Sequence, residues 1–149
     1  MSFKLVENKI DDSKFISCKE FFNPIKNKKD ISSPIKFDMC EFILCLLIGL
    51  KHDRKETLKE YEFQKSSFAQ NYIGDYIDMK PLITGLLLSK IIKSAGIDRN
   101  EKDKVKDIMK NALDSNEATF LKKETIDIMH QYYLGGFCIL LNEFECKPP

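Results

Sequence analysis

An uninterrupted apolar run in the first third of the chain constrains the fold more than any other feature. Residues 42–50, FILCLLIGL, carry no charge and lie between Glu41 and Lys51. A helix that crosses a bilayer needs about 20 consecutive apolar residues, and this run has fewer than half that number. Its apolar side chains would occupy every face of a helix, which is typical of a helix that neighbours surround. We therefore predict a central core helix that ends near His52, not a membrane span.

Length and composition favour one folded domain. The chain has 149 residues, of which 43% are hydrophobic and 32% charged, as in ordinary globular proteins. Its 24 lysine and arginine residues nearly cancel its 23 aspartate and glutamate residues, so the formal net charge is +1. Since no long-range field of one sign surrounds such a chain, nucleic acid or an anionic membrane would need a local basic patch to bind.

The N-terminus and the cysteines indicate a compartment. The first residues, MSFKLVENKIDD, lack the apolar segment of a signal peptide and include acidic residues early, so we expect a cytoplasmic protein. The cysteines form an odd set without C-x-x-C spacing: Cys18, Cys40, Cys45, Cys138 and Cys146. We expect reduced thiols that pack as small hydrophobic side chains, not a disulfide framework.

Residues 1–36 differ from the rest of the chain. They contain scattered aromatic residues, several lysines and two prolines, with no sustained apolar period. Proline removes a backbone donor and restricts the residue before it, so these features favour loops. We therefore divide the chain into a partly extended N-terminal arm, residues 1–36, and a helical domain, residues 37–149.

Helical patterns continue after the central run. Residues 53–70 are strongly charged and fit a solvent-facing helix, although like charges four residues apart weaken it. A second core helix should begin near Pro81 and end at Gly96, which supplies the left-handed residue that stops a helix. The apolar residues that we place on its inward stripe include Leu82, Ile83, Leu86 and Leu87.

The last third of the chain predicts two more helices. Residues 98–115 have the apolar period of an amphipathic surface helix. The final segment is predicted to be a long helix. Gly135 and Gly136 should kink or restart this helix, or let a neighbouring backbone come close to it. No Asn-Gly or Asp-Gly pair marks a hairpin, so strands have little support. We predict an all-α fold: a single bundle-like domain of about five or six helices with an extended N-terminal arm.

The two histidines limit the catalytic and metal chemistry available. His52 follows the core helix, where a cation complements the helix dipole, so we expect a structural role. His130 lies three residues after Asp127, a pairing that can orient an imidazole but is common by chance. Cys40 and Cys45 point about 140° apart around a helix, which disfavours a metal site that joins them to His52.

Other chemistry has weaker support. Cys138 follows two glycines, but its apolar neighbours indicate burial, which raises a thiol pKa. Asp75 and Asp78 could form a carboxylate pair, although solvated acids near turns are far commoner. No glycine pattern of a phosphate-binding loop is present. We therefore predict no catalytic residue, no metal and no cofactor.

Aromatic residues of the arm and of the last helix are the candidate contacts for a protein partner. Buried aromatic anchors dominate many interfaces. The predicted partner-binding residues are Phe21, Phe22, Tyr132, Tyr133, Phe137 and Phe144. The alternative is that the helices of one domain bury these side chains between them.

A lysine cluster in the arm supports a second hypothesis. Lysines neutralise phosphates, and neighbouring aromatic rings stack on exposed bases. The candidate nucleic-acid-binding residues are Lys26, Lys28, Lys29 and Lys36. Asp30 interrupts the cluster and arginine is scarce, so this binding mode is not favoured.

These patterns together favour a non-catalytic small helical subunit or adaptor of a larger intracellular protein assembly. It would dock through its N-terminal arm and an exposed aromatic helix face, either on a larger protein or as a homo-oligomer. An accessory subunit that contacts nucleic acid through the arm lysines is the alternative. A small enzyme with an acid–base site at Asp75 and Asp78, or at Asp127 and His130, comes third.

Overall fold

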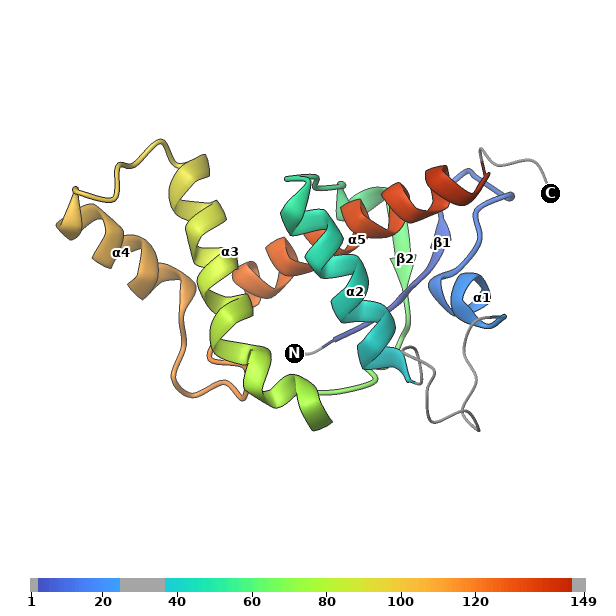
Figure 1. Cartoon of the computed structure of the whole chain (residues 1–149), viewed down its shortest axis with the longest axis horizontal. Helices are drawn as coiled ribbons and strands as arrows, with labels where there is room; N and C mark the ends of the chain where they lie inside the picture. Colours follow the sequence, from blue (N-terminus) through green and yellow to red (C-terminus); the bar gives the residue numbers. More distant parts are fainter. Residues whose placement is uncertain (1–2, 25–36, 146–149) are drawn as a thin grey trace.

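The computed structural model describes residues 3–24 and 37–145, and the fold is mostly helical, with 58% helix (Figure 1). The described part contains five α-helices, two short 3₁₀ helices (η) and one two-stranded sheet. In chain order the elements are β1 Val6–Lys9, α1 Cys18–Phe22, α2 Asp38–Lys51, η1 Leu58–Glu60, β2 Tyr61–Phe63, η2 Gly74–Met79, α3 Lys80–Ser94, α4 Lys102–Ala112 and α5 Lys123–Glu145. The mostly helical character agrees with the prediction, and the sheet was not expected.

The core lies where α2 and α5 cross (Figure 1). Nine of the 14 residues of α2 are buried, which confirms the prediction of a central core helix. The crossing depends on glycine: a Cβ on Gly49 would overlap the carbonyl of Tyr132, and a Cβ on Gly136 would overlap the carbonyl of Cys45. The two backbones are therefore in direct contact. α5 continues through Gly135 and Gly136, so this glycine pair does not restart the helix. The predicted close approach of a neighbouring backbone is confirmed.

The N-terminal residues do not form an independent arm over the part that is described. β1 pairs antiparallel with β2, and the backbone NH of Phe3 donates to the carbonyl of Ala69 at 2.9 Å. Phe3, Leu5 and Val6 are each at most 1% exposed, so they belong to the same core as α2 and α5. The N-terminal segment thus carries apolar side chains without a helical period. It is extended, and its pairing with a distant strand holds it in place.

Residues 53–70 do not form the predicted helix. They contain η1 and β2 instead. Two physical reasons favour the strand: aromatic residues suit a half-buried sheet, and like charges four residues apart weaken a helix. The strand forms because β1 pairs with it. β1 lies more than 50 residues earlier in the chain, so the sequence of residues 53–70 alone does not indicate this pairing.

Helices α3 and α4 extend away from the α2–α5 crossing and form one end of the molecule in Figure 1. α3 buries Ile83, Leu87 and Leu88, whereas α4 buries only Ala112. Gly96 follows α3 with φ of +71°, which confirms the predicted stop. None of the described helices combines the length and the hydropathy of a bilayer-spanning segment.

Candidate functional site

Most of the aromatic residues predicted to meet a partner lie in the core. Tyr132, Tyr133, Phe137 and Phe22 are each at most 1% exposed. The prediction of an exposed aromatic face on the last helix is therefore wrong, and the alternative of mutual burial is confirmed for these four. The reason is tertiary: the N-terminal segment packs against α5, and the NH of Val6 donates to the Tyr133 hydroxyl at 3.0 Å.

The two remaining aromatic candidates lie at the rim of this core. The ring of Phe21 is half-buried and packs edge-on against Phe137 and Phe144, with centroid distances of 5.7 and 5.6 Å. Phe144 is 58% exposed. The predicted nucleic-acid contacts, Lys26, Lys28, Lys29 and Lys36, lie outside the described residues.

His130 is a structural residue. Its Nδ1 lies 2.9 Å from the carbonyl of Ile126, and its Nε2 accepts a hydrogen bond from the NH of Lys4 at 3.2 Å. Both ring nitrogens are thus engaged with the backbone, in an arrangement that suits the neutral imidazole with its proton on Nδ1. Burial lowers the pKa of His130 below its usual value. Asp127 is exposed, so the pair does not resemble an oriented acid–base site.

The other reactive candidates are dispersed. Cys40 and Cys45 are buried in α2, while His52 is exposed at the end of that helix. Asp75 and Asp78 are both exposed on η2. Among the described residues, no three histidine, cysteine or acidic side chains form a group that could hold a metal ion.

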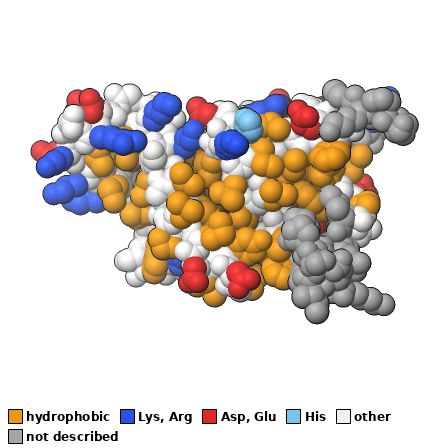
Figure 2. Space-filling view, viewed as in Figure 1, with side chains coloured by type: hydrophobic (Ala, Val, Ile, Leu, Met, Phe, Trp, Pro, Cys, Tyr) orange, Lys and Arg blue, Asp and Glu red, His pale blue; other side chains and the backbone are white. Residues whose placement is uncertain are grey.

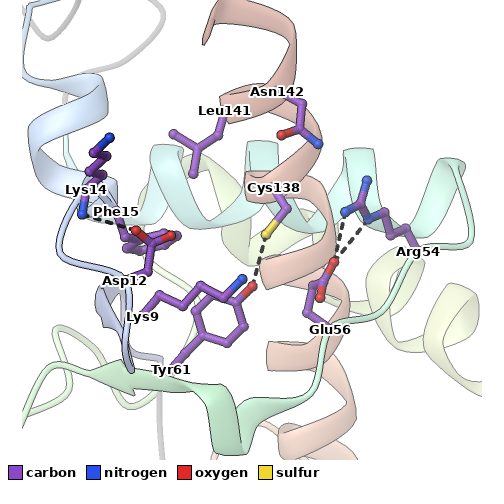
Figure 3. A pocket seen from close by; sticks show the side chains of 10 residues that line it. All are labelled: Lys9, Asp12, Lys14, Phe15, Arg54, Glu56, Tyr61, Cys138, Leu141 and Asn142. Carbon is purple, nitrogen blue, oxygen red and sulfur yellow. Dashed lines mark hydrogen bonds and ion pairs between the residues drawn. The ribbon is translucent and has the colours of Figure 1, made fainter.

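A polar cavity of about 410 Å³ lies between the N-terminal segment, the loop after α2, β2 and α5 (Figure 3). Its charges are mostly satisfied internally: the Arg54 guanidinium donates twice to one Glu56 oxygen, at 2.9 and 3.1 Å. Lys9 lies 5.6 Å from the centroid of the Tyr61 ring. The lining residues are Lys9, Asp12, Lys14, Phe15, Arg54, Glu56, Tyr61, Cys138, Leu141 and Asn142.

The thiol of Cys138 lines this cavity. The Cys138 sulfur lies 3.5 Å from the Tyr61 hydroxyl, and Figure 3 shows the two groups facing each other. Burial raises the pKa of Cys138, and the hydrogen bond with Tyr61 offsets this in part. Burial also raises the pKa of Tyr61. These raised pKa values favour the neutral thiol and the neutral phenol near neutral pH.

A second feature is an apolar surface over α2 and α3. Figure 2 shows hydrophobic side chains gathered over these two helices on the face in view. Five large apolar residues of this region are between 37% and 58% exposed, and we call them the apolar surface: Leu44, Ile73, Ile77, Leu82 and Leu86. Exposed apolar side chains that gather on one face are candidates for an interaction site.

The apolar surface was missed from the sequence because Leu82 and Leu86 were placed on the inward stripe of α3. The structure buries Ile83 and Leu87 but leaves Leu82 and Leu86 outside. The available signal was that α3 carries apolar residues on more than one side. It could not be used without knowing how many neighbours α3 has.

Comparison of the chain with protein-family models, with curated proteins and with solved structures finds no match in any of the three. The geometry of the two features above is therefore the basis for a functional proposal.

Proposed function

We propose that this chain is a non-catalytic, bundle-like accessory subunit that binds another protein chain through the apolar surface of α2, η2 and α3. The single observation that carries the proposal is the exposure of Leu82 and Leu86 on a helix that already packs on the core through Ile83 and Leu87. Removing such side chains from water contributes about 25 cal/mol per Å², so a complementary partner would be bound favourably. A cytoplasmic location belongs to the proposal and rests on the sequence alone.

The proposed docking surface differs from the one expected from the sequence. Phe3, Leu5 and Phe22 contribute buried side chains to the core, so these residues are not available to a separate partner. Tyr132, Tyr133 and Phe137 of α5 are buried as well, whereas Phe144 is exposed. α3 keeps Leu82 and Leu86 exposed on the side away from its buried Ile83 and Leu87.

Site-specific photo-crosslinking tests this proposal. A benzophenone amino acid in place of Leu82, in the protein expressed in its own cells, should give a covalent product with one defined protein chain. The matched control carries the same amino acid in place of Glu124, an exposed residue of α5. Leu86→Asp in the Leu82 variant should abolish the product, since a charge on the contact surface opposes docking. Equal products at positions 82 and 124, or none at 82, would contradict the proposal.

A further inference from the structure

The polar cavity in Figure 3 is formed by segments that lie far apart in the sequence. Its lining comes from the end of β1 and the residues that follow it, the loop after α2, strand β2 and the second half of α5. Its volume of about 410 Å³ lies in the usual range of small-molecule sites, about 300–1,000 Å³. The tertiary structure therefore brings distant polar side chains around a hollow that can hold a small molecule.

The lining carries an excess of positive charge. Three cationic side chains and two carboxylates line the cavity, so one positive charge remains. Arg54 pairs with Glu56 through Nε and Nη2, and its Nη1 makes no hydrogen bond within the described residues. Lys9 is half-buried over the Tyr61 ring, and in residues 3–24 and 37–145 no carboxylate pairs with it. These two cations favour a bound anion, because charge-assisted hydrogen bonds are stronger than neutral ones.

The hydrogen-bond donors of the cavity surround Cys138. Figure 3 shows Lys9 and Tyr61 below the Cys138 sulfur, Arg54 to one side and Asn142 above it. Burial raises the pKa of Cys138, while the charges of Arg54 and Lys9 lower it, so both cations are close enough to act at this point. An anion in the cavity would therefore meet an ammonium group and a guanidinium group together.

One side of the cavity is apolar. Figure 3 shows Phe15 and Leu141 on the same side of Cys138. The Phe15 ring packs edge-on against Tyr61 and Phe137, with centroid distances of 5.6 and 5.9 Å, so it forms a fixed wall. A ligand that fills the cavity therefore needs an apolar part beside its charged group.

The two carboxylates of the lining limit the charge of the anion. Asp12 and Glu56 would repel a dianion, and a phosphate monoester carries a charge of about −1.5 to −2 near neutral pH. A carboxylate carries a single negative charge, which matches the single positive charge that the lining leaves over. Charge and shape together favour a monocarboxylate over a phosphate.

From these observations we propose that the cavity is a binding site for a small monocarboxylate with an apolar part. Its carboxylate group lies between Lys9 and Arg54, and its apolar part lies against Phe15 and Leu141. The site goes beyond the proposed docking function, because it shares no residue with the apolar surface.

An NMR titration of the isotope-labelled chain near neutral pH and at fixed ionic strength tests the site. The probes are benzoate and phenylacetate, with benzyl alcohol as the neutral analogue and inorganic phosphate as the more highly charged anion. Both monocarboxylates should shift the amide signals of Lys9, Arg54 and Asn142 in a saturable way. The dissociation constants should be about 10 mM or lower, the affinity that the usual binding energy per non-hydrogen atom gives. Benzyl alcohol should bind at least about fivefold more weakly, since it has no charge.

Two variants of the cavity should change the affinity in opposite directions. Lys9→Met keeps the apolar length of the side chain but removes its charge, so it should raise the dissociation constant of benzoate at least about fivefold. Glu56→Gln removes a carboxylate that repels the ligand and competes for Arg54, so it should lower this constant at least about threefold. Lys102→Met is the matched control, because it removes the same charge at an exposed position of α4, and it should leave the affinity within about twofold of wild type.

The outcomes decide the proposal. No saturable shift with either monocarboxylate, equal binding of benzyl alcohol, or unchanged affinity in Lys9→Met would overturn the site. Tighter binding of inorganic phosphate than of benzoate by the wild-type chain would overturn the choice of a monocarboxylate. None of these results depends on the crosslinked product at position 82, so the proposed function is tested separately.

Discussion

Three glycines set how closely α2 and α5 approach each other. Gly49 and Gly136 face the partner helix, and a Cβ on Gly135 would overlap the carbonyl of Arg54 in the loop after α2. In each case the obstructing atom belongs to the backbone, which cannot move aside as a flexible side chain can. Overpacking at such positions forces the whole helix to shift.

We predict that Gly136→Ala destabilises the protein by about 2–4 kcal/mol, because the added methyl group has no room against the Cys45 carbonyl. Gly85→Ala is the matched control: its Cβ meets nothing, so the gain in helix propensity should stabilise the protein by about 0.5–1 kcal/mol. Urea denaturation monitored by circular dichroism measures both changes. Similar values for the two variants would show that the close crossing is not as described.

His130 makes the stability depend on pH. Burial lowers its pKa in the folded state, so below about pH 6.5 the unfolded chain binds a proton that the folded chain resists. The free energy of unfolding should therefore fall as the pH drops below 6.5, by up to about 1.4 kcal/mol per pH unit from this residue. Its contribution is fully present only above that pH.

His130→Gln should reduce this slope between about pH 5 and 6.5, because the titrating group is gone. Denaturation at a series of pH values gives the slope for each variant. His52→Gln, at the exposed end of α2, controls for the loss of a histidine as such. An unchanged slope in His130→Gln would show that other groups cause the acid sensitivity.

At the scale of elements, the pairing of β1 with β2 joins the first residues of the chain to the segment that follows α2. The Phe3 ring packs edge-on against Phe42 of α2 at 5.2 Å and against Tyr72 at 5.1 Å. The extended N-terminal segment therefore packs an aromatic side chain on a side of α2 that the other helices do not cover. Two strands alone are marginal in water, so their stability comes from this packing.

We predict that Phe3→Ala destabilises the protein by about 3–5 kcal/mol, the usual cost of removing a fully buried phenylalanine. Ile10→Ala, just after β1 and 47% exposed, is the control and should change the stability by less than about 0.5 kcal/mol. The midpoint of urea denaturation reports both. If Phe3→Ala were as mild as the control, the N-terminal segment would be a dispensable arm, as the sequence alone had indicated.

At the scale of the whole molecule, burial is unevenly distributed. α2 buries nine residues, α3 three and α4 one. The core around α2 and α5 therefore opens only when the protein unfolds, whereas the α3–α4 end is held by less packing. Regions with few buried apolar contacts open locally at lower free energy.

We expect native-state hydrogen exchange to reflect this order. Amides of α4 should exchange through local opening, faster than those of α2 and α5 by about two orders of magnitude or more, which corresponds to about 2.8 kcal/mol. Mass spectrometry of peptic fragments measures the rates. Equal protection of α4 and α2 would contradict the uneven distribution of stability.

The amino-acid sequence by itself determined the helical class, the central core helix and the stop at Gly96, because apolar period and glycine conformation are local or nearly local signals. Only the tertiary structure decided the rest. The strand in residues 61–63 exists because β1 pairs with it, and Tyr132, Tyr133 and Phe137 of α5 are buried because distant segments, including residues 3–24, pack around them. Leu82 and Leu86 are exposed because α3 has the core on one side only. Each of these outcomes depends on which distant segment supplies the neighbouring surface, and no local pattern contains that information.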